Sequence, residues 1–123
     1  MKIEKFLKES KLLEIRRAYQ DIESKVEAPL KKLDLTLNQA LVLVALHGDG
    51  SKSTRPSNLA ETFGLSRSQV SQILSHLESM QFLRRIVDPK DARSYRLKLN
   101  ESKRRTVLDV MQTIERGERE VGT

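Results

Sequence analysis

Residues 54–101 decide the fold, and they have the sequence TRPSNLAETFGLSRSQVSQILSHLESMQFLRRIVDPKDARSYRLKLNE. The first part predicts a short helix over residues 56–63, after which Gly64 permits a tight turn. A second helix is expected to begin at Ser66, because Ser66 and Gln69 have the spacing of a capping box. Apolar residues recur along this second helix at the helical period and predict its buried face, namely Val70, Ile73, Leu74 and Leu77.

The segment that follows predicts a β-hairpin. Residues 82–87 form the first expected strand, residues 88–94 a loop that contains Pro89, and residues 95–99 the second strand. Apolar and basic residues alternate in the second strand, so one face of the hairpin should be buried. A pair of short helices followed by a basic hairpin predicts a winged helix-turn-helix, which places one helix in the major groove of duplex DNA.

Helical patterns also precede this motif. An N-terminal helix is expected within residues 1–28, and Pro29 marks an interruption. Thr36 and Gln39 have the spacing of another capping box. The helix that follows, over residues 37–47, is apolar almost all round and should therefore lie in the centre of the domain.

A C-terminal helix is expected within residues 101–121, with Asn100 as its cap. We therefore expect a mainly α fold with a small β-hairpin (α+β), in which residues 1–123 form a single winged-helix domain around a core at residues 35–100. The apolar faces of the first and last helices have no obvious partner within the chain. A homodimer that packs these terminal helices together would bury them.

The positive charge is concentrated in one segment. The chain has a net charge of +6 and a pI near 9.8. Residues 84–105 contain nine basic and three acidic residues, so this segment alone accounts for the net charge. Such a surface is typical of a polyanion site, because neutralising phosphates releases counterions. A solvated basic face is the alternative, but the coincidence with the helix pair favours DNA binding.

The composition argues against several other classes. The absence of cysteine removes disulfides, thiolate metal sites, cysteine nucleophiles and thiol-based sensing. His47 and His76 have no ligand at metal-binding spacing, so we expect no metal and no cofactor. Neither a nucleophile with its base nor a glycine-rich nucleotide cradle is visible, which argues against an enzyme. No apolar window approaches the ~20 residues of a membrane span, so we expect a soluble cytoplasmic protein, associated with the nucleoid and not with a membrane.

Over residues 35–101 the sequence resembles the MarR family of bacterial transcription regulators (multiple antibiotic resistance regulators). The resemblance rests on four segments, which are Leu35-Thr36-Leu37, Asn58-Leu59-Ala60, Gly64-Leu65-Ser66 and Asp88-Pro89-Lys90-Asp91-Ala92-Arg93. The last is similar to the family's Asp-x-x-Asp-x-Arg wing signature. The chain is shorter than most members of this family, and in this respect it also resembles the staphylococcal accessory regulators.

Two features depart from the family pattern. Gln81 stands where the family usually has glycine, so a left-handed turn there would cost about 1 kcal/mol or would be replaced by another geometry. Family members also usually continue beyond the position of Thr123 into a further helix that completes the dimer interface.

The resemblance implies a dimer whose recognition helices enter adjacent major grooves while the wings reach the minor groove. In the recognition helix it implies contacts from Ser66, Arg67, Ser68, Ser71, Gln72, Ser75 and His76. In the wing it implies DNA contacts from Lys90, Arg93 and Arg96, with Asp88 and Asp91 stiffening the loop or orienting Arg93. Phosphate contacts are expected from Lys52, Thr54 and Arg55. Glutamine suits adenine in the major groove, and arginine suits a narrow minor groove.

We therefore predict a sequence-specific regulator that binds double-stranded DNA as a homodimer, most simply a repressor. An architectural DNA-binding protein of low sequence specificity is one alternative. A winged-helix interaction module, whose basic wing docks on an acidic protein, is the other. The family often binds aromatic acids between the dimer helices and the DNA-binding lobe, but no residue pattern in this sequence identifies such a pocket, so the effector is unknown.

Overall fold

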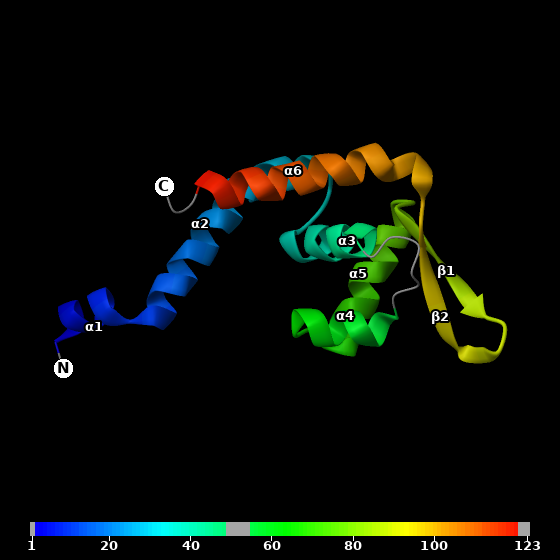
Figure 1. The fold of residues 1–123 in the computed structure, drawn as a ribbon, viewed down its shortest axis with the longest axis horizontal. Coiled ribbons are helices and arrows are strands. Elements are labelled where there is room, and N and C mark those ends of the chain that lie inside the picture. The colour runs from blue at the N-terminus through cyan, green and yellow to red at the C-terminus, as the bar shows by residue number, and fades with distance from the viewer. Residues whose placement is uncertain (1, 49–54, 121–123) are drawn as a thin grey trace.

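The computed structural model describes residues 2–48 and 55–120, apart from the side chains of residues 92–94. In Figure 1, α6 runs alongside the second half of α2, α3 to α5 lie below them, and the β-hairpin projects at the end opposite α1. This architecture confirms the expected mainly α fold with a small hairpin. The elements are α1 (Ile3–Glu9), α2 (Lys11–Lys32), α3 (Leu37–Gly48), α4 (Pro56–Phe63), α5 (Arg67–Ser79), β1 (Leu83–Asp88), β2 (Asp91–Leu99), a 3-10 turn η1 (Glu101–Lys103) and α6 (Arg104–Glu120).

Helix α3 lies at the centre of the core, as its apolar composition predicts. Its first turn is closed by the expected capping box, in which the Gln39 N–H donates to Thr36 Oγ1 at 3.2 Å and the Thr36 N–H donates to Gln39 Oε1 at 2.9 Å. The helix packs against α2, α5 and α6, and the side chains of Ala40, Val42 and Leu43 are fully buried. A helix covered on several sides needs apolar residues around most of its circumference.

The prediction that Pro29 interrupts the first helix is wrong, because α2 continues to Lys32. Proline lacks the N–H that would bond the carbonyl of Lys25, so the helix forgoes one hydrogen bond. Val26 and Leu30 lie close to Pro29 in the chain, and each is only 1% exposed. The burial of these two side chains offsets the lost hydrogen bond and keeps the last turn helical.

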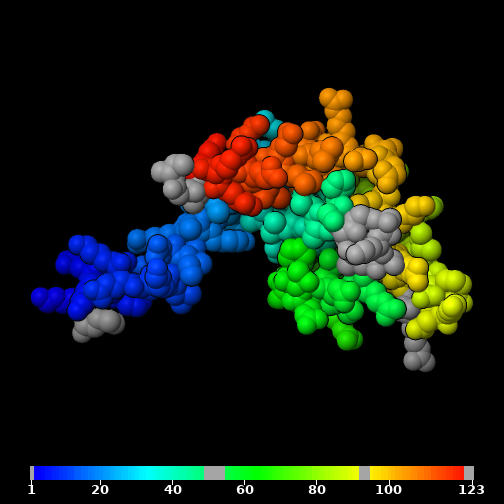
Figure 2. All heavy atoms as spheres, viewed as in Figure 1, coloured from blue at the N-terminus to red at the C-terminus, as the bar shows by residue number. Residues whose placement is uncertain are grey.

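The break in the N-terminal helical segment lies at Ser10 instead. Ser10 has an extended backbone, and its Oγ accepts the N–H of Leu13 at 3.2 Å, so it ends α1 and caps α2. No residue of α1 is buried. Figure 1 and Figure 2 show α1 and the beginning of α2 extending away from the other helices. Large apolar side chains of this extension are exposed, namely Ile3, Phe6, Leu7, Leu12, Ile15 and Tyr19.

Helix α6, in contrast, buries its apolar face within the chain, which corrects the expectation that it lacks an internal partner. It packs against the second half of α2 and against α3, and its buried side chains are Val107, Val110 and Ile114. Gly117 permits the close approach, because a Cβ at that position would lie 2.5 Å from Cγ1 of Val26. At the end of the helix, Lys25 Nζ donates to the carbonyl oxygen of Glu120 at 3.2 Å.

The hairpin is longer than the sequence pattern indicated. β1 and β2 pair antiparallel from Leu83 opposite Leu99 to Val87 opposite Tyr95, and Asp88 then lies opposite Asp91 after an irregularity in the register. The loop expected over residues 88–94 is therefore wrong, because β2 already begins at Asp91. The Lys90 N–H donates to Asp88 Oδ1 at 2.9 Å, and this side-chain contact closes a shorter turn than strand alternation predicts.

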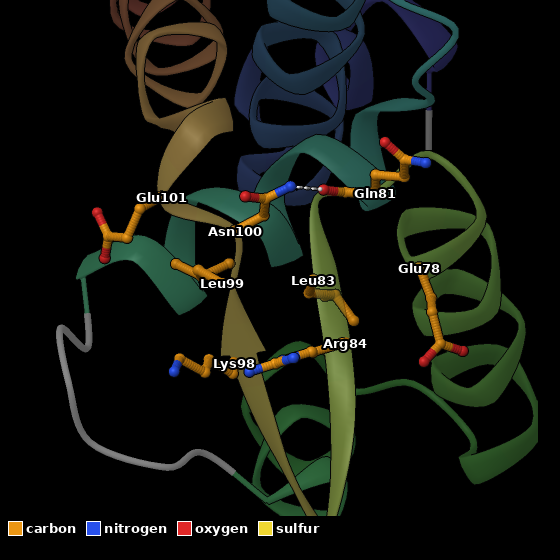
Figure 3. A pocket seen from close by; sticks show the side chains of 8 residues that line it. All are labelled: Glu78, Gln81, Leu83, Arg84, Lys98, Leu99, Asn100 and Glu101. Atoms are coloured by element: carbon orange, nitrogen blue, oxygen red, sulfur yellow. Dashed lines mark hydrogen bonds between the residues drawn. The ribbon is translucent and has the colours of Figure 1, made fainter.

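Gln81 adopts the left-handed conformation, the first of the two geometries expected for this position, with φ of 66°. The strain is offset locally, because Asn100 Nδ2 donates to the Gln81 carbonyl oxygen at 2.8 Å, as Figure 3 shows. Asn100 Oδ1 also accepts the N–H of Ser102 at 3.1 Å, as expected of a cap. The Asn100 side chain thus joins the two ends of the hairpin and caps the start of the C-terminal helical segment.

Candidate nucleic-acid interface

The helix-turn-helix is built from local signals. Gly64 ends α4 in the left-handed conformation, with φ of 64°, and the following N–H of Leu65 donates to the Ala60 carbonyl oxygen at 3.0 Å. The Gln69 N–H donates to Ser66 Oγ at 3.1 Å, and the Ser66 N–H donates to Gln69 Oε1 at 2.9 Å. This capping box starts α5, so Ser66 serves the helix, and its hydroxyl hydrogen and one lone pair remain for other partners.

Helix α5 has one apolar face and one face of short polar side chains. The apolar residues Val70, Ile73, Leu74 and Leu77 are buried against the core. The side chains that point the other way are exposed, and they include Arg67, Ser68, Ser71, Gln72 and Ser75. The exposed face therefore presents hydroxyl, amide and guanidinium groups, all of which form hydrogen bonds with base edges and phosphates.

Two of the predicted contact residues on α5 already have partners inside the protein. Ser75 Oγ accepts a hydrogen bond from Arg85 Nη2 at 2.9 Å. His76 Nε2 lies 2.9 Å from the carbonyl oxygen of Asp34 and 4.0 Å from its carboxylate Oδ2. These contacts tie α5 to β1 and to the turn before α3, so Ser75 and His76 have less freedom to contact DNA than Ser68 or Gln72.

The wing places its basic residues on an exposed hairpin. Lys90 and Arg96 are exposed, and Asp88 holds the turn through its contact with the backbone of Lys90. Asp91 begins β2, opposite Asp88. The Arg93 side chain, Lys52 and Thr54 lie outside the described residues, whereas Arg55 is exposed at the N-cap of α4.

The outward face of the hairpin is strongly basic. Arg84 lies opposite Lys98 across the two strands, and Ile86 lies opposite Arg96. A cavity of about 480 Å³ opens at the root of the hairpin, and Figure 3 shows its lining, which includes Arg84, Lys98, Gln81 and Asn100. Two cations in adjacent cross-strand positions repel one another. A polyanion neutralises that repulsion, and this favours phosphate binding near the wing.

A second cavity, of about 430 Å³, lies between α2 and the start of α3. The carboxylates of Glu23 and Glu27 and the ammonium group of Lys31 are among its lining groups. Partial burial and, to a smaller degree, the Glu23 carboxylate raise the pKa of the Tyr19 phenol. Within residues 2–48 and 55–120, no group of three or more metal-ligating side chains comes together. Nor is any helix in those ranges long and apolar enough to cross a membrane.

Sequence reasoning missed the role of Arg85, which it counted only as one of several basic residues. Arg85 contacts Ser75 and Glu78 of α5 and lies over the ring of Tyr95 on β2. Successive side chains of β1 point to opposite faces, and this alternation could have revealed the role of Arg85. Arg85 is two residues from the buried Leu83 and so lies on the same face. A basic residue on the inward face of a strand requires partners, and α5 supplies them.

Comparisons with known proteins agree with this geometry. The repressor CouR, bound to a 23-mer DNA duplex, is 23% identical with a TM-score of 0.79, and the match covers 94% of this chain and 80% of CouR. BpsR from Bordetella bronchiseptica is 22% identical with a TM-score of 0.77, and the match covers 92% of this chain and 79% of BpsR. A mutant of MepR from S. aureus, bound to an oligodeoxyribonucleotide, is 22% identical with a TM-score of 0.70, covering 90% of this chain and 80% of MepR.

The search of curated proteins finds no match to this sequence. A family model described as the MarR family matches residues 33–94, which include the helix-turn-helix and most of the wing. The matched segment is half of the chain, and the solved structures share its fold. The chain therefore belongs to the MarR family of DNA-binding transcription regulators.

Proposed function

We propose that this regulator binds a two-fold symmetric DNA site as a homodimer and represses transcription by occupying a promoter. The exposed face of α5 is the observation that carries this proposal. Ser68, Ser71 and Gln72 are exposed on it, while Val70 and Ile73 anchor the opposite face in the core. An anchored helix that presents short polar groups fits the major groove, where those groups reach base edges.

The wing supplies the second part of the contact. Lys90 and Arg96 are exposed on the hairpin, and we assign them, together with Arg93, to the backbone and minor groove beside the site. CouR and MepR are each described as bound to DNA, and their fold is that of this chain. This likeness supports a protein that acts on the nucleoid in the cytoplasm.

The homodimer is supported by the exposed apolar side chains of the N-terminal extension. Ile3, Leu12 and Ile15 are exposed on helices that extend away from the rest of the chain in Figure 1. A second copy that covers this face would bury apolar area worth ~25 cal/mol per Å². Two-fold symmetry would then place the recognition helices on half-sites about 34 Å apart, or a multiple of that distance.

Selection of bound fragments from random duplex DNA tests the proposal. The wild-type protein should recover a symmetric sequence and prefer it over bulk duplex by roughly 10³-fold or more. A Gln72→Ala variant should lose discrimination at one base pair in each half-site, by ~1–3 kcal/mol, because glutamine pairs with adenine through two hydrogen bonds. Gln112→Ala, at an exposed glutamine of α6, is the matched control and should select the wild-type sequence.

Each alternative has its own outcome in the same experiment. Site preferences in Gln72→Ala that are identical to those of the wild type would refute the assignment of Gln72. Binding without a recovered sequence would favour an architectural protein. The absence of binding to any duplex at low salt would favour a protein-interaction module, because electrostatic attraction to phosphates is strongest there.

A further inference from the structure

We propose that Arg85 is a positioning residue that holds the wing at a fixed angle to the recognition helix, so that both elements meet DNA as one rigid unit. The consequence for DNA binding rests on the proposed function. The mechanical connection is a property of the free protein and is tested without DNA.

The first support is the set of contacts between Arg85 and α5. Arg85 Nη2 donates to Ser75 Oγ at 2.9 Å and to the Ser71 carbonyl oxygen at 3.4 Å. Arg85 Nε lies 3.7 Å from Glu78 Oε1, and the Arg85 backbone N–H donates to Glu78 Oε2 at 3.2 Å. The three partners span two turns of α5, so the side chain resists both rotation and sliding of β1 along the helix.

The second support is that Arg85 also contacts the other strand. Its guanidinium carbon lies 5.1 Å from the centroid of the Tyr95 ring on β2. A cation at this distance from an aromatic face is attracted by the negative potential of the ring. The Arg85 side chain is only 27% exposed. A partly buried guanidinium that loses its partners leaves an uncompensated charge, which disfavours alternative wing positions.

The third support is the place of Arg85 along the hairpin. The root is anchored by the buried side chains of Leu83 and Leu97. Beyond Arg85 on β1, Ile86 is 39% and Val87 63% exposed, so the helices provide little packing for this strand there. Tyr95, which lies opposite Val87 on β2, packs against the core and against the Arg85 guanidinium. Arg85 thus links α5 to β1 near the point where the apolar packing of this strand ends.

Because of this position, a small rotation of the strand at Arg85 displaces the tip of the wing. Asp88, the last residue of β1, is three residues further along, or about 10 Å at ~3.4 Å per strand residue. A rotation of about 15° at Arg85 would therefore move this end of the strand by about 2.7 Å, which is close to the length of a hydrogen bond. A wing that is free to rotate by this amount would lose its register with the minor groove while the recognition helix still binds.

Spin-label distance measurements on the DNA-free protein test the connection directly. The chain has no cysteine, so Glu61→Cys on α4 and Lys90→Cys at the turn would carry the only labels. The distance distribution should be at least twice as broad in Arg85→Met as in the labelled wild type. It should also broaden in Arg85→Lys, because lysine keeps the charge but lacks the planar fork. Arg84→Met, a neighbouring change with the same loss of charge on the outward face, should leave the width unchanged.

A double variant, Ser75→Ala with Glu78→Gln, keeps the test valid if Arg85→Met does not fold. Both positions are exposed on α5, and their side chains are acceptors for Arg85. The double variant keeps the contacts of Arg85 with the Ser71 carbonyl oxygen and with Tyr95, so it should show a smaller broadening in the same direction. Wild-type widths in a folded Arg85→Lys protein and in the double variant would overturn the proposal.

Hydroxyl-radical footprinting on the selected site tests the consequence for DNA. The double variant removes one negative charge, so a purely electrostatic role of Arg85 predicts equal or stronger protection everywhere. A positioning role predicts at least three-fold weaker protection at the wing-contacted nucleotides, with protection by α5 retained. Equal or stronger wing protection would overturn the positioning role. If the wild type binds no duplex, the proposed function fails, and the spin-label widths alone decide the role of Arg85.

Discussion

The two halves of α2 share one helical pattern but lie in opposite environments. In the first half, Leu12 is 78% and Ile15 64% exposed, whereas in the second half Val26 and Leu30 are each 1% exposed. Both halves place apolar residues at helical spacing, but α6 packs against the second half near Val26, and the first half extends away from the other helices in Figure 1. A period of 3.6 residues therefore predicts that a helix has an apolar face and does not predict what covers it.

Because of this difference in exposure, the two halves of α2 have different roles. Its second half belongs to the core of one chain, where burial stabilises the fold. Its first half, together with α1, forms the surface that we propose for the second copy. Substitutions in the two halves should therefore change different quantities, namely the free energy of unfolding and the dissociation constant of the dimer.

The largest effect is expected for Leu30→Ala in the buried half. Removal of a fully buried leucine side chain should lower the free energy of unfolding by about 2–5 kcal/mol, because apolar burial is lost and a cavity is left. Urea denaturation at a fixed protein concentration measures this change. Leu12→Ala is the matched control, the same substitution in the exposed half, and it should cost much less when both variants are measured as monomers, at protein concentrations below the dissociation constant of the dimer. Equal losses in the free energy of unfolding for both variants would contradict the difference between the two halves of α2.

The second expected effect is on assembly. Ile15→Glu should raise the dissociation constant of the dimer at least ten-fold, or by ~1.4 kcal/mol, because a carboxylate buried in an apolar interface loses its hydration. Sedimentation equilibrium measures the constant, and circular dichroism should show an unchanged helix content. Gln20→Glu makes the same charge change at an exposed polar position of α2 and should have little effect. A dimer that tolerates Ile15→Glu would place the interface elsewhere.

The smallest effect concerns the close packing of α6 on the second half of α2. Gly117→Ala would place a Cβ 2.5 Å from Cγ1 of the buried Val26, which is too close without a shift of either helix. Overpacking lowers the free energy of unfolding by about 1–3 kcal/mol, whereas the higher helix propensity of alanine raises it by about 1 kcal/mol. We expect a net loss of about 1 kcal/mol in thermal or urea unfolding. At Gly48 an added Cβ meets no atom within 4 Å, so Gly48→Ala should be neutral or stabilising. A stable Gly117→Ala protein would show that the two helices pack less rigidly.

Most of the helix-turn-helix could be predicted from the sequence because its signals are local. Ser66 and Gln69 close the first turn of α5 as their spacing predicts, and Thr36 and Gln39 do the same for α3. The buried face of α5 was also predicted residue by residue. Capping and helical periodicity involve residues within about two turns of one another, so a single chain segment contains the whole signal.

The rest of the candidate site depends on contacts between distant segments. Ser75 looks like any other serine on the free face of α5, but β1 brings Arg85 to it. His76 meets the backbone of Asp34, which lies in the turn before α3. No spacing rule along α5 predicts either partner, so the sequence does not reveal that Ser75 and His76 have partners within the protein.

The amino-acid sequence by itself determined that the helix-turn-helix is followed by a hairpin and a C-terminal helix, that the recognition helix has a capped start and that positive charge is concentrated at the wing. Those features follow from backbone propensities and from charges that need no distant partner. The tertiary structure decided that the helix continues through Pro29, that α6 is covered within the chain and that Arg85 joins the wing to α5. These features depend on long-range packing, in which the burial of neighbouring side chains outweighs a local preference.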